Sequence, residues 1–187
     1  MLKIHYSAYN YLGQCQIDLE LLSGKLYLLQ APNGAGKTTL LKLMQGLQLE
    51  ESFFNHQGSF DALEHYHIDD ILDILKFQDF NKNLFESLLL IGDLQKQRHK
   101  SLATYSAGQK QWLKNILSLS MMKQNYFFDE PFNYLDYEKS RLLLRTIQDF
   151  LSQGKMFFIV DHNPFYEDSI YKKLKMTATN SGVLLSE

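Results

Sequence analysis

The sequence predicts an α/β fold with a mostly parallel sheet, because short apolar runs alternate along the chain with stretches of helical spacing. The apolar runs are residues 26–29, 126–128 and 156–160. Apolar side chains recur at helical spacing in residues 38–47, 108–122 and 137–153. Nearly continuous apolar strands are typical of a parallel sheet covered on both faces, and the intervening helices supply that cover.

The N-terminal part has a different pattern. Residues 2–6 and 15–21 alternate apolar and polar side chains. Strict alternation is typical of strands with one buried and one solvated face. We therefore expect a pair of antiparallel N-terminal strands beside the parallel core.

A third region is helical throughout. Apolar residues between 70 and 93 recur at helical spacing, with a break near residues 79–83, and the helix expected at 108–122 follows. This pattern predicts a small helical subdomain at about residues 70–125. The chain has neither an internal repeat nor a Pro/Ser-rich linker, so we expect residues 1–187 to form a single domain.

Composition excludes several classes of protein. The chain has 187 residues, 45% of them apolar, and a net charge of −2, so it is globular and has no bulk positive field to attract nucleic acid. Its single cysteine, Cys15, excludes an intrachain disulfide. The N-terminus does not resemble a signal peptide, and the apolar runs are far shorter than the roughly 20 residues that span a bilayer. We expect a cytoplasmic protein that binds no nucleic acid.

A phosphate-binding loop lies between the strand expected at 26–29 and the helix that follows. Its residues are Ala31, Pro32, Asn33, Gly34, Ala35, Gly36, Lys37, Thr38 and Thr39. The glycines let backbone N–H groups surround the phosphates of a nucleotide, Lys37 reaches the β and γ phosphates, and the Thr38 hydroxyl ligates Mg²⁺. The motif ordinarily opens with glycine where Ala31 stands, which is a mild departure unless that position needs a positive φ.

Two carboxylates end the apolar strand at 126–128. Ligands of parallel sheets bind at the carboxyl ends of the strands, which is where Asp129 and Glu130 are expected. Asp129 is suited to hold Mg²⁺ through water, as the Walker B acid of P-loop ATPases does. Glu130 is suited to accept a proton from a water that attacks the γ-phosphate. A phosphate loop paired with such a strand predicts a P-loop nucleotide-binding protein that uses Mg²⁺, and nucleotide kinases, GTPases and helicases all fit this description.

Further motifs in the right order resemble those of ABC ATPases. Ser106, Ala107, Gly108 and Gln109 resemble the signature of that family, usually written Leu-Ser-Gly-Gly-Gln. Residues 129–136 resemble its Walker B run continuing into a D-loop that ends at Asp136, and His162 matches its switch histidine. Tyr9 or Tyr11 matches the aromatic that stacks on adenine, and Tyr11 is the one we carry forward. The chain is identified by this resemblance as a member of the ABC ATPases, with a P-loop NTPase fold of ABC type.

The resemblance implies how the site works. In ABC ATPases two domains pair head to tail, and ATP lies between the phosphate loop of one and the signature of the other. Residues 106–109 would grip the γ-phosphate held by the partner, Asp136 would help to couple the two sites, and His162 would hold the γ-phosphate and the attacking water in line with Glu130. The expected partners are a second ATPase domain, most simply a second copy of this chain, and a multi-span permease that holds the protein at the inner face of the membrane.

The sequence also departs from the family pattern. Tyr105 and Ala107 replace the leucine and the first glycine of the signature. The Q-loop glutamine, which touches Mg²⁺ and the permease, has Gln57 as its best candidate, with His65 or His67 as alternatives. The short stretch 52–68 is expected to form the wall against which a permease helix docks, and its aromatic residues are candidates for that contact. These are Phe53, Phe54, Phe60 and Tyr66.

Three functional classes remain open at this point. Residues 106–109, 129–132 and 162–164 look like the ATPase subunit of the cytochrome c maturation haem-export system. Pro-Phe-Asn-Tyr-Leu-Asp at 131–136 resembles instead the D-loop region of soluble translation ATPases, although those proteins usually carry two ATPase domains in one chain. A clamp that binds ATP without hydrolysing it is the third class, and the presence of Lys37, Asp129, Glu130 and His162 argues against it.

Overall fold

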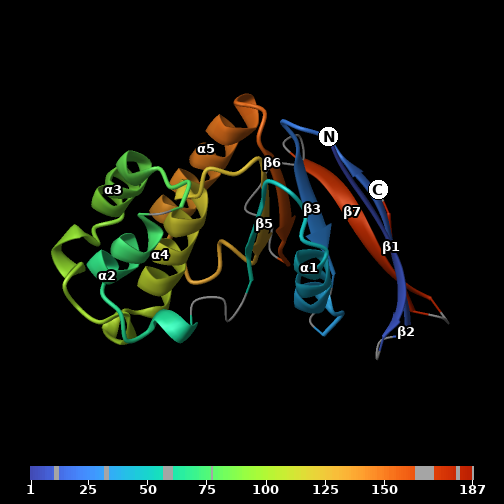
Figure 1. Cartoon of the computed structure of the whole chain (residues 1–187), viewed down its shortest axis with the longest axis horizontal. Coiled ribbons are helices and arrows are strands. Elements are labelled where there is room, and N and C mark those ends of the chain that lie inside the picture. The colour runs from blue at the N-terminus through green and yellow to red at the C-terminus, as the bar shows by residue number, and fades with distance from the viewer. Residues whose placement is uncertain are drawn as a thin grey trace.

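The computed structural model describes residues 1–10, 13–31, 34–56, 61–76, 78–162, 171–179 and 182–186. Within them, eight strands form one sheet in the order β1-β2-β8-β7-β3-β6-β5-β4 (Figure 1). The strands are β1 (Leu2–Asn10), β2 (Gly13–Leu21), β3 (Leu26–Gln30), β4 (Ser52–Asn55), β5 (Asn125–Asp129), β6 (Met156–Val160), β7 (Tyr171–Thr179) and β8 (Gly182–Ser186). The helices are α1 (Lys37–Gly46), α2 (Ile68–Leu75), α3 (Lys82–Ile91), α4 (Ala107–Ser120) and α5 (Tyr137–Ser152).

The predicted parallel core is confirmed. Strands β7, β3, β6, β5 and β4 pair in parallel, each with its neighbour in the sheet. β1 and β2 form the expected antiparallel pair. This pair joins the core through β8, which is parallel to β2 and antiparallel to β7. The sheet is therefore continuous from the N-terminal pair to the parallel strands.

Three strands have no counterpart in the sequence prediction. β4 has only two apolar residues, Phe53 and Phe54, too short a run to predict a strand. In β7, exposed Lys172 and Lys173 precede buried Leu174, so the strand lacks the apolar run that marks the central strands. β4 ends one edge of the sheet and β8 bridges its two parts. An edge strand such as β4 is covered less completely and needs less apolar sequence, whereas β8 carries an apolar run at 183–185 that the sequence prediction did not use.

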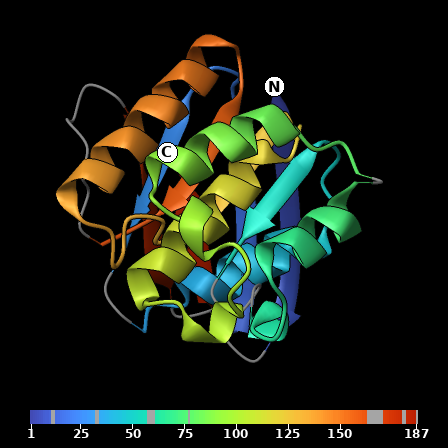
Figure 2. The same ribbon diagram turned by 90° about the vertical axis from the view of Figure 1, so that its left-hand side faces the viewer.

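Side chains of the central strands point alternately to two buried layers. Leu28, Phe128 and Ile159 join the layer formed with helices α2 to α5. Leu29, Phe127 and Phe158 join the layer formed with α1, β1 and β2. Figure 1 shows α1 between the central strands and the curled β1-β2 end of the sheet, and Figure 2 shows the other helices in front of the strands. Burial on both faces explains the continuous apolar runs of these strands.

Helices α3, α4 and α5 begin at residues whose side chains cap them. Asn81 accepts a hydrogen bond from Leu84 N, 3.0 Å away, and starts α3. Ser106 and Gln109 exchange hydrogen bonds at the start of α4 in a capping box. Asp136 Oδ1 accepts from Lys139 N, 2.8 Å away, and starts α5. Each bond satisfies an N–H group that the helix itself leaves unpaired.

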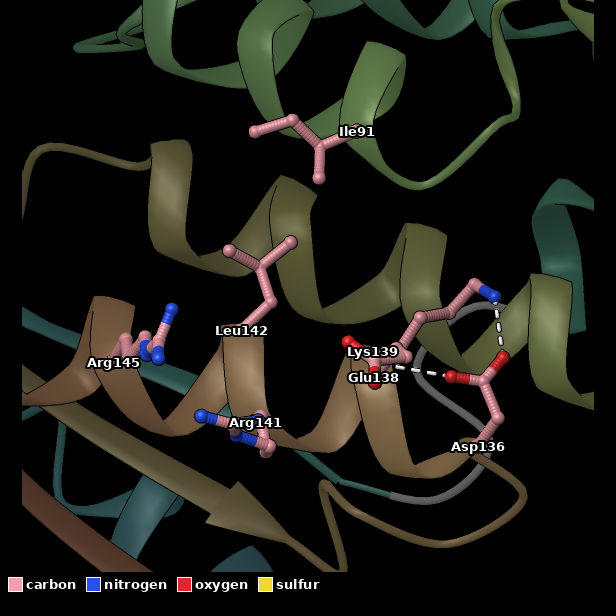
Figure 3. A pocket seen from close by; sticks show the side chains of 7 residues that line it. All are labelled: Ile91, Asp136, Glu138, Lys139, Arg141, Leu142 and Arg145. Carbon is pink, nitrogen blue, oxygen red and sulfur yellow. Dashed lines mark hydrogen bonds and ion pairs between the residues drawn. The ribbon is translucent and has the colours of Figure 1, made fainter.

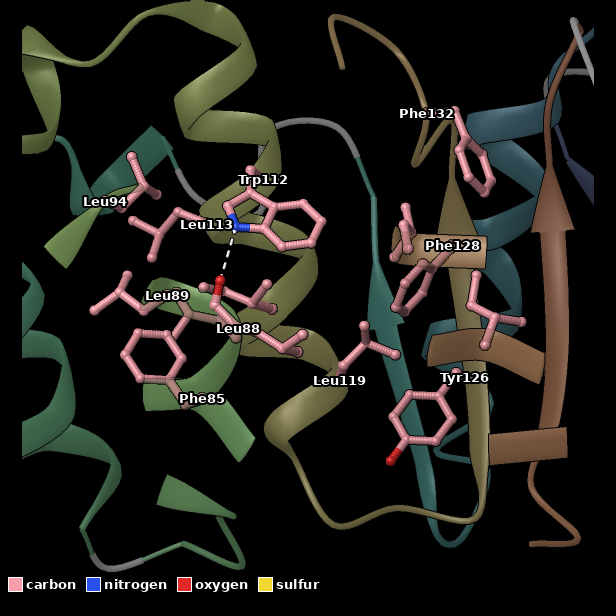
Figure 4. Close-up of a cluster of buried hydrophobic side chains, with 14 of the residues drawn as sticks. Phe85, Leu88, Leu89, Leu94, Trp112, Leu113, Leu119, Tyr126, Phe128 and Phe132 are labelled. Carbon is pink, nitrogen blue, oxygen red and sulfur yellow. Dashed lines mark hydrogen bonds between the residues drawn. The ribbon is translucent and has the colours of Figure 1, made fainter. Parts of the chain in front are cut away.

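Trp112 is the largest fully buried side chain on the helical side of the sheet (Figure 4). Its Nε1 donates to Leu88 O, 3.2 Å away, and so joins α4 to α3. A Cβ on Gly92 would lie 1.9 Å from that nitrogen. The glycine therefore makes room for the indole ring.

The permease-facing role expected for Phe53 and Phe54 stays a prediction, and both rings are half-buried against the core. Phe54 stacks on Phe127 with ring centroids 4.4 Å apart, and Phe53 packs against the core on the helical side of the sheet. Both rings lie on β4, whose side chains meet the two layers of the core. Tyr66 is 41% exposed, and Phe60 lies outside the described residues.

In the part of the chain that the structure describes, none of the helices has the length and apolar character needed to cross a membrane.

Candidate active site

A cleft of about 590 Å³ lies at the carboxyl ends of the central strands. It combines the start of α1 with the residues that follow β5 and β6. The lining residues are Gly34, Gly36, Lys37, Thr38, Thr39, Glu130, Asn133, Tyr134 and His162. Three motifs that are distant in the sequence therefore meet at one edge of the sheet, as expected for a parallel sheet.

Thr38 and Asp129 form the centre of this arrangement. Thr38 Oγ1 donates to Asp129 Oδ2, 2.7 Å away. Asp129 is 2% exposed, and its other oxygen, Oδ1, is buried without a hydrogen-bond partner among the described residues. A hydroxyl beside a carboxylate with an unused oxygen is a donor set that Mg²⁺ prefers, with phosphate oxygens and water completing its shell. These two residues therefore fit a magnesium ion.

The phosphate loop has the backbone that the motif requires. Gly34 and Gly36 take φ angles of 77° and 89°, which favour glycine. Ala31 has no positive φ, so its methyl group is no obstacle there, and its carbonyl accepts a hydrogen bond from Lys37 Nζ, 2.8 Å away. The departure at this position is therefore mild. Pro32 and Asn33 lie outside the described residues, and Ala35 precedes α1 without lining the cleft.

Glu130 follows β5 in a left-handed conformation, with φ of 48°. Its N–H donates to Val160 O of the neighbouring strand, 2.7 Å away. Its carboxylate lies with Oε1 3.1 Å from His162 Nδ1, and Oε2 accepts a hydrogen bond from Asn133 Nδ2. Only 12% of the Glu130 side chain is exposed, so the carboxylate faces the cleft from a mostly enclosed position.

The predicted signature residues lie at the start of α4 and do not line the cleft of their own chain. Ser106 and Ala107 are exposed at the start of α4, and none of residues 106–109 lines the cleft. Gly108 is essential for packing, since a Cβ there would lie 2.6 Å from Tyr134 O. Tyr105 points into the helical side of the protein, where its hydroxyl donates to Gln97 O, 2.9 Å away, and burial raises its pKa. Tyr105 is therefore a buried residue of the core.

Asp136 lines a second pocket, formed by α5 and the end of α3 (Figure 3). Its carboxylate caps α5 and binds Lys139 Nζ at 2.6 Å. Hydrogen bonds from Lys139 lower the pKa of Asp136. Asp136 follows the cleft residues Asn133 and Tyr134 closely in the chain, but its side chain lines a separate pocket.

Of the remaining candidates, only the two histidines can be placed relative to the cleft. Tyr11 and Gln57 lie outside the described residues. His65 is exposed beyond β4, and His67 caps α2, with Nδ1 2.9 Å from Asp70 Oδ2. Neither histidine lines the cleft.

Sequence reasoning missed two lining residues, Asn133 and Tyr134. Both belong to the turn that follows Glu130, and Tyr134 has a positive φ of 63°. Both lie inside the run 129–136 recognised in the sequence, which gave roles only to Asp129, Glu130 and Asp136.

Comparison with known proteins supports the same class. No family model matches the chain. The manganese transport system ATP-binding protein MntB of Halalkalibacterium halodurans is 23% identical over 75% of this chain and 66% of its own length. A solved ATP-binding subunit of an ABC transporter matches 93% of this chain and 84% of its own, with a TM-score of 0.78 and 17% identity. The chain has the fold of an ABC-type P-loop NTPase.

The ABC-type fold also occurs in larger proteins. A solved RNase-L inhibitor matches 99% of this chain with a TM-score of 0.77 and 18% identity, but this chain spans only 39% of it. The likeness concerns the fold. It shows that a single ABC-type unit of this size is also built into a longer chain.

Proposed function

We propose that the chain is the ATP-hydrolysing subunit of an ABC transporter. The observation that carries the proposal is the cleft, in which Lys37, Thr38, Glu130 and His162 line one space beside buried Asp129. Several relatives are named as ATP-binding proteins of transport systems, which supports both ATP hydrolysis and the link to transport.

Each residue has a definite task in hydrolysis. The Lys37 ammonium and the N–H groups at the start of α1 hold the phosphates. Thr38 and Asp129 hold Mg²⁺, which neutralises charge on the phosphate oxygens when bound. Glu130 accepts a proton from the attacking water, and His162, 3.1 Å from that carboxylate, keeps the water and the γ-phosphate in line.

The position of the signature supports a dimer. Residues 106–109 lie outside the cleft of their own chain, and Ser106 and Ala107 are exposed. A second copy arranged head to tail would bring them to its γ-phosphate, with the N-terminus of α4 adding N–H donors. Asp136 then couples the two sites, and the undescribed Tyr11 and Gln57 are proposed to contact adenine and Mg²⁺.

The proposed partner is a multi-span permease at the inner face of the membrane. The segments at 106–109, 129–132 and 162–164 resemble the haem-export subunit, so a haem-export permease is the first partner to test. With a net charge of −2, the chain is not expected to bind nucleic acid.

The test is purification of the tagged chain from detergent-solubilised membranes of its own cells, with ribosomal and nucleic-acid fractions analysed in parallel. We expect a multi-span membrane protein to co-purify and to stimulate Mg-ATPase activity. Lys37→Ala is the matched variant, which should weaken nucleotide binding and abolish the stimulation while retaining the partner. Recovery with ribosomes or DNA alone would contradict transport and favour a soluble ABC ATPase.

A further inference from the structure

We propose that Asn133 is a positioning residue for the hydrolysis reaction. Its amide holds the Glu130 carboxylate in the orientation from which that carboxylate takes a proton from water. The inference rests on the proposed function, because only ATP hydrolysis gives Glu130 a water to activate. It concerns a residue that lies inside the recognised run 129–136 but has been given no role there.

The Glu130 carboxylate has a polar neighbour at each oxygen, and the one at Oε2 is a hydrogen bond. Asn133 Nδ2 donates to Oε2, and His162 Nδ1 lies 3.1 Å from Oε1. Rotation of the carboxylate about its last carbon–carbon bond would break one contact or the other. The two contacts together set the orientation of the carboxylate plane.

The backbone that carries Asn133 is itself braced. Asn133 N donates to Glu130 O, 3.2 Å away, which closes the turn. Two side chains of α4 hold the turn from behind: Gln111 Nε2 donates to the carbonyls of Glu130 and Pro131, and Asn115 Nδ2 donates to Pro131 O, 2.6 Å away. The turn therefore cannot shift without breaking bonds to a buried helix.

Gly108 fixes the far end of the same turn. A Cβ at Gly108 would lie 2.6 Å from Tyr134 O, so the turn packs directly against the start of α4. Side chains held by a rigid backbone lose little freedom when they position a reacting group. Asn133 is thus aimed at Glu130 by the fold before any nucleotide arrives.

Asparagine is also common in turns for purely structural reasons, because its side chain bonds nearby backbone. Here the backbone N–H of Asn133 makes the turn bond, and its side-chain amide goes to the Glu130 carboxylate. The amide is therefore available for a role in the site.

The experiment measures steady-state Mg-ATPase kinetics of the full chain and three variants. Asn133→Ala should lower kcat by about 10- to 100-fold, the scale expected when a reacting group loses its alignment, with KM for ATP unchanged. Asn133→Ser keeps a shorter donor and should recover part of the loss. Asn83→Ala, an exposed asparagine of α3, is the matched control and should retain wild-type kcat.

A second comparison tests whether Asn133 acts through Glu130. In a Glu130→Gln background, Asn133→Ala should cause no further loss of kcat, because the group it positions is already gone. An equal loss in both backgrounds, or a raised KM with unchanged kcat, would overturn the inference. A wild-type chain without ATPase activity would overturn the proposed function itself, whereas an active wild type with an unimpaired Asn133→Ala would overturn the role of Asn133 alone.

Discussion

Thr38 Oγ1 lies 2.7 Å from Asp129 Oδ2, although the two residues are 91 positions apart in the chain. The contact joins the start of α1 to the end of β5, and it leaves the buried Oδ1 of Asp129 without a hydrogen-bond partner among the described residues. It is the structural relationship on which the expected metal dependence of the site rests.

We predict that Thr38→Val and Asp129→Asn weaken the binding of Mg²⁺ at the site. Each variant removes one oxygen donor or its charge, so more Mg²⁺ should be needed for half-maximal ATPase activity. Nucleotide binding in EDTA should change little, because Lys37 and the loop N–H groups remain. A magnesium titration followed by ATPase rate measures this. Wild-type magnesium dependence in both variants would contradict the assignment.

Dimerisation is predicted to depend on nucleotide. Glu130→Gln should bind ATP without turning it over, so in Mg-ATP its mass by light scattering should approach that of a dimer and return to that of a monomer in ADP. Ser106→Arg in the same background should prevent the shift, since a bulky cation would occupy the exposed start of α4. If the mass measured by light scattering is the same in Mg-ATP and in ADP, even with the permease supplied, the head-to-tail arrangement would be contradicted.

Gly92 is predicted to be intolerant of any side chain. Gly92→Ala would place a Cβ 1.9 Å from Trp112 Nε1, and such overpacking costs about 1–3 kcal/mol of unfolding free energy. Gly46→Ala is the matched control, because an added Cβ there has no neighbour within 4 Å and should stabilise α1 by up to about 1 kcal/mol. Urea unfolding of both variants measures the difference, and equal effects would contradict this account of Trp112.

Stability is predicted to vary with pH through Arg98, which binds Asp69 and Glu86. Hydrogen bonds from Arg98 lower the pKa of Asp69 in the folded protein. Because the pKa of Asp69 is lower in the folded than in the unfolded protein, its ionised form stabilises the fold. This contribution is complete at pH values above the ordinary aspartate pKa of about 3.9, and it is lost as the pH falls through the pKa of the folded state. The effect is modest because 46% of the Asp69 side chain is exposed.

Arg98→Met should therefore lower Tm at pH 7 and lose less Tm than the wild type between about pH 5 and pH 3. Lys76→Met removes an exposed cation 3.5 Å from Asp73 and serves as the control, with little change in the pH dependence. Parallel Tm curves for Arg98→Met and the wild type would contradict the predicted link between Arg98 and Asp69.

The central strands and the phosphate loop were predictable because their physical requirements leave direct marks in sequence. Burial on both faces demands apolar runs such as 156–160, and the backbone of the loop demands glycine at Gly34 and Gly36. The start of α4 was equally visible, since Ser106 and Gln109 form a local capping box.

Other features depend on distant contacts that no local pattern encodes. β8 acquires its place by pairing with β2 and β7 from opposite sides. The packing of Phe53 and Phe54 against the core is visible only in the folded sheet. Asn133 faces Glu130 because a turn braced by α4 aims it there, and its residue type alone gives no sign of this.

The most direct test of the central claim is steady-state Mg-ATP hydrolysis by the wild-type chain and Glu130→Gln, with ATP binding measured on the same samples. Removal of a general base typically lowers the rate by roughly 100- to 10,000-fold. The account predicts a loss of that size in Glu130→Gln with ATP binding retained. Equal turnover in the two proteins, or binding without hydrolysis by the wild type, would contradict it.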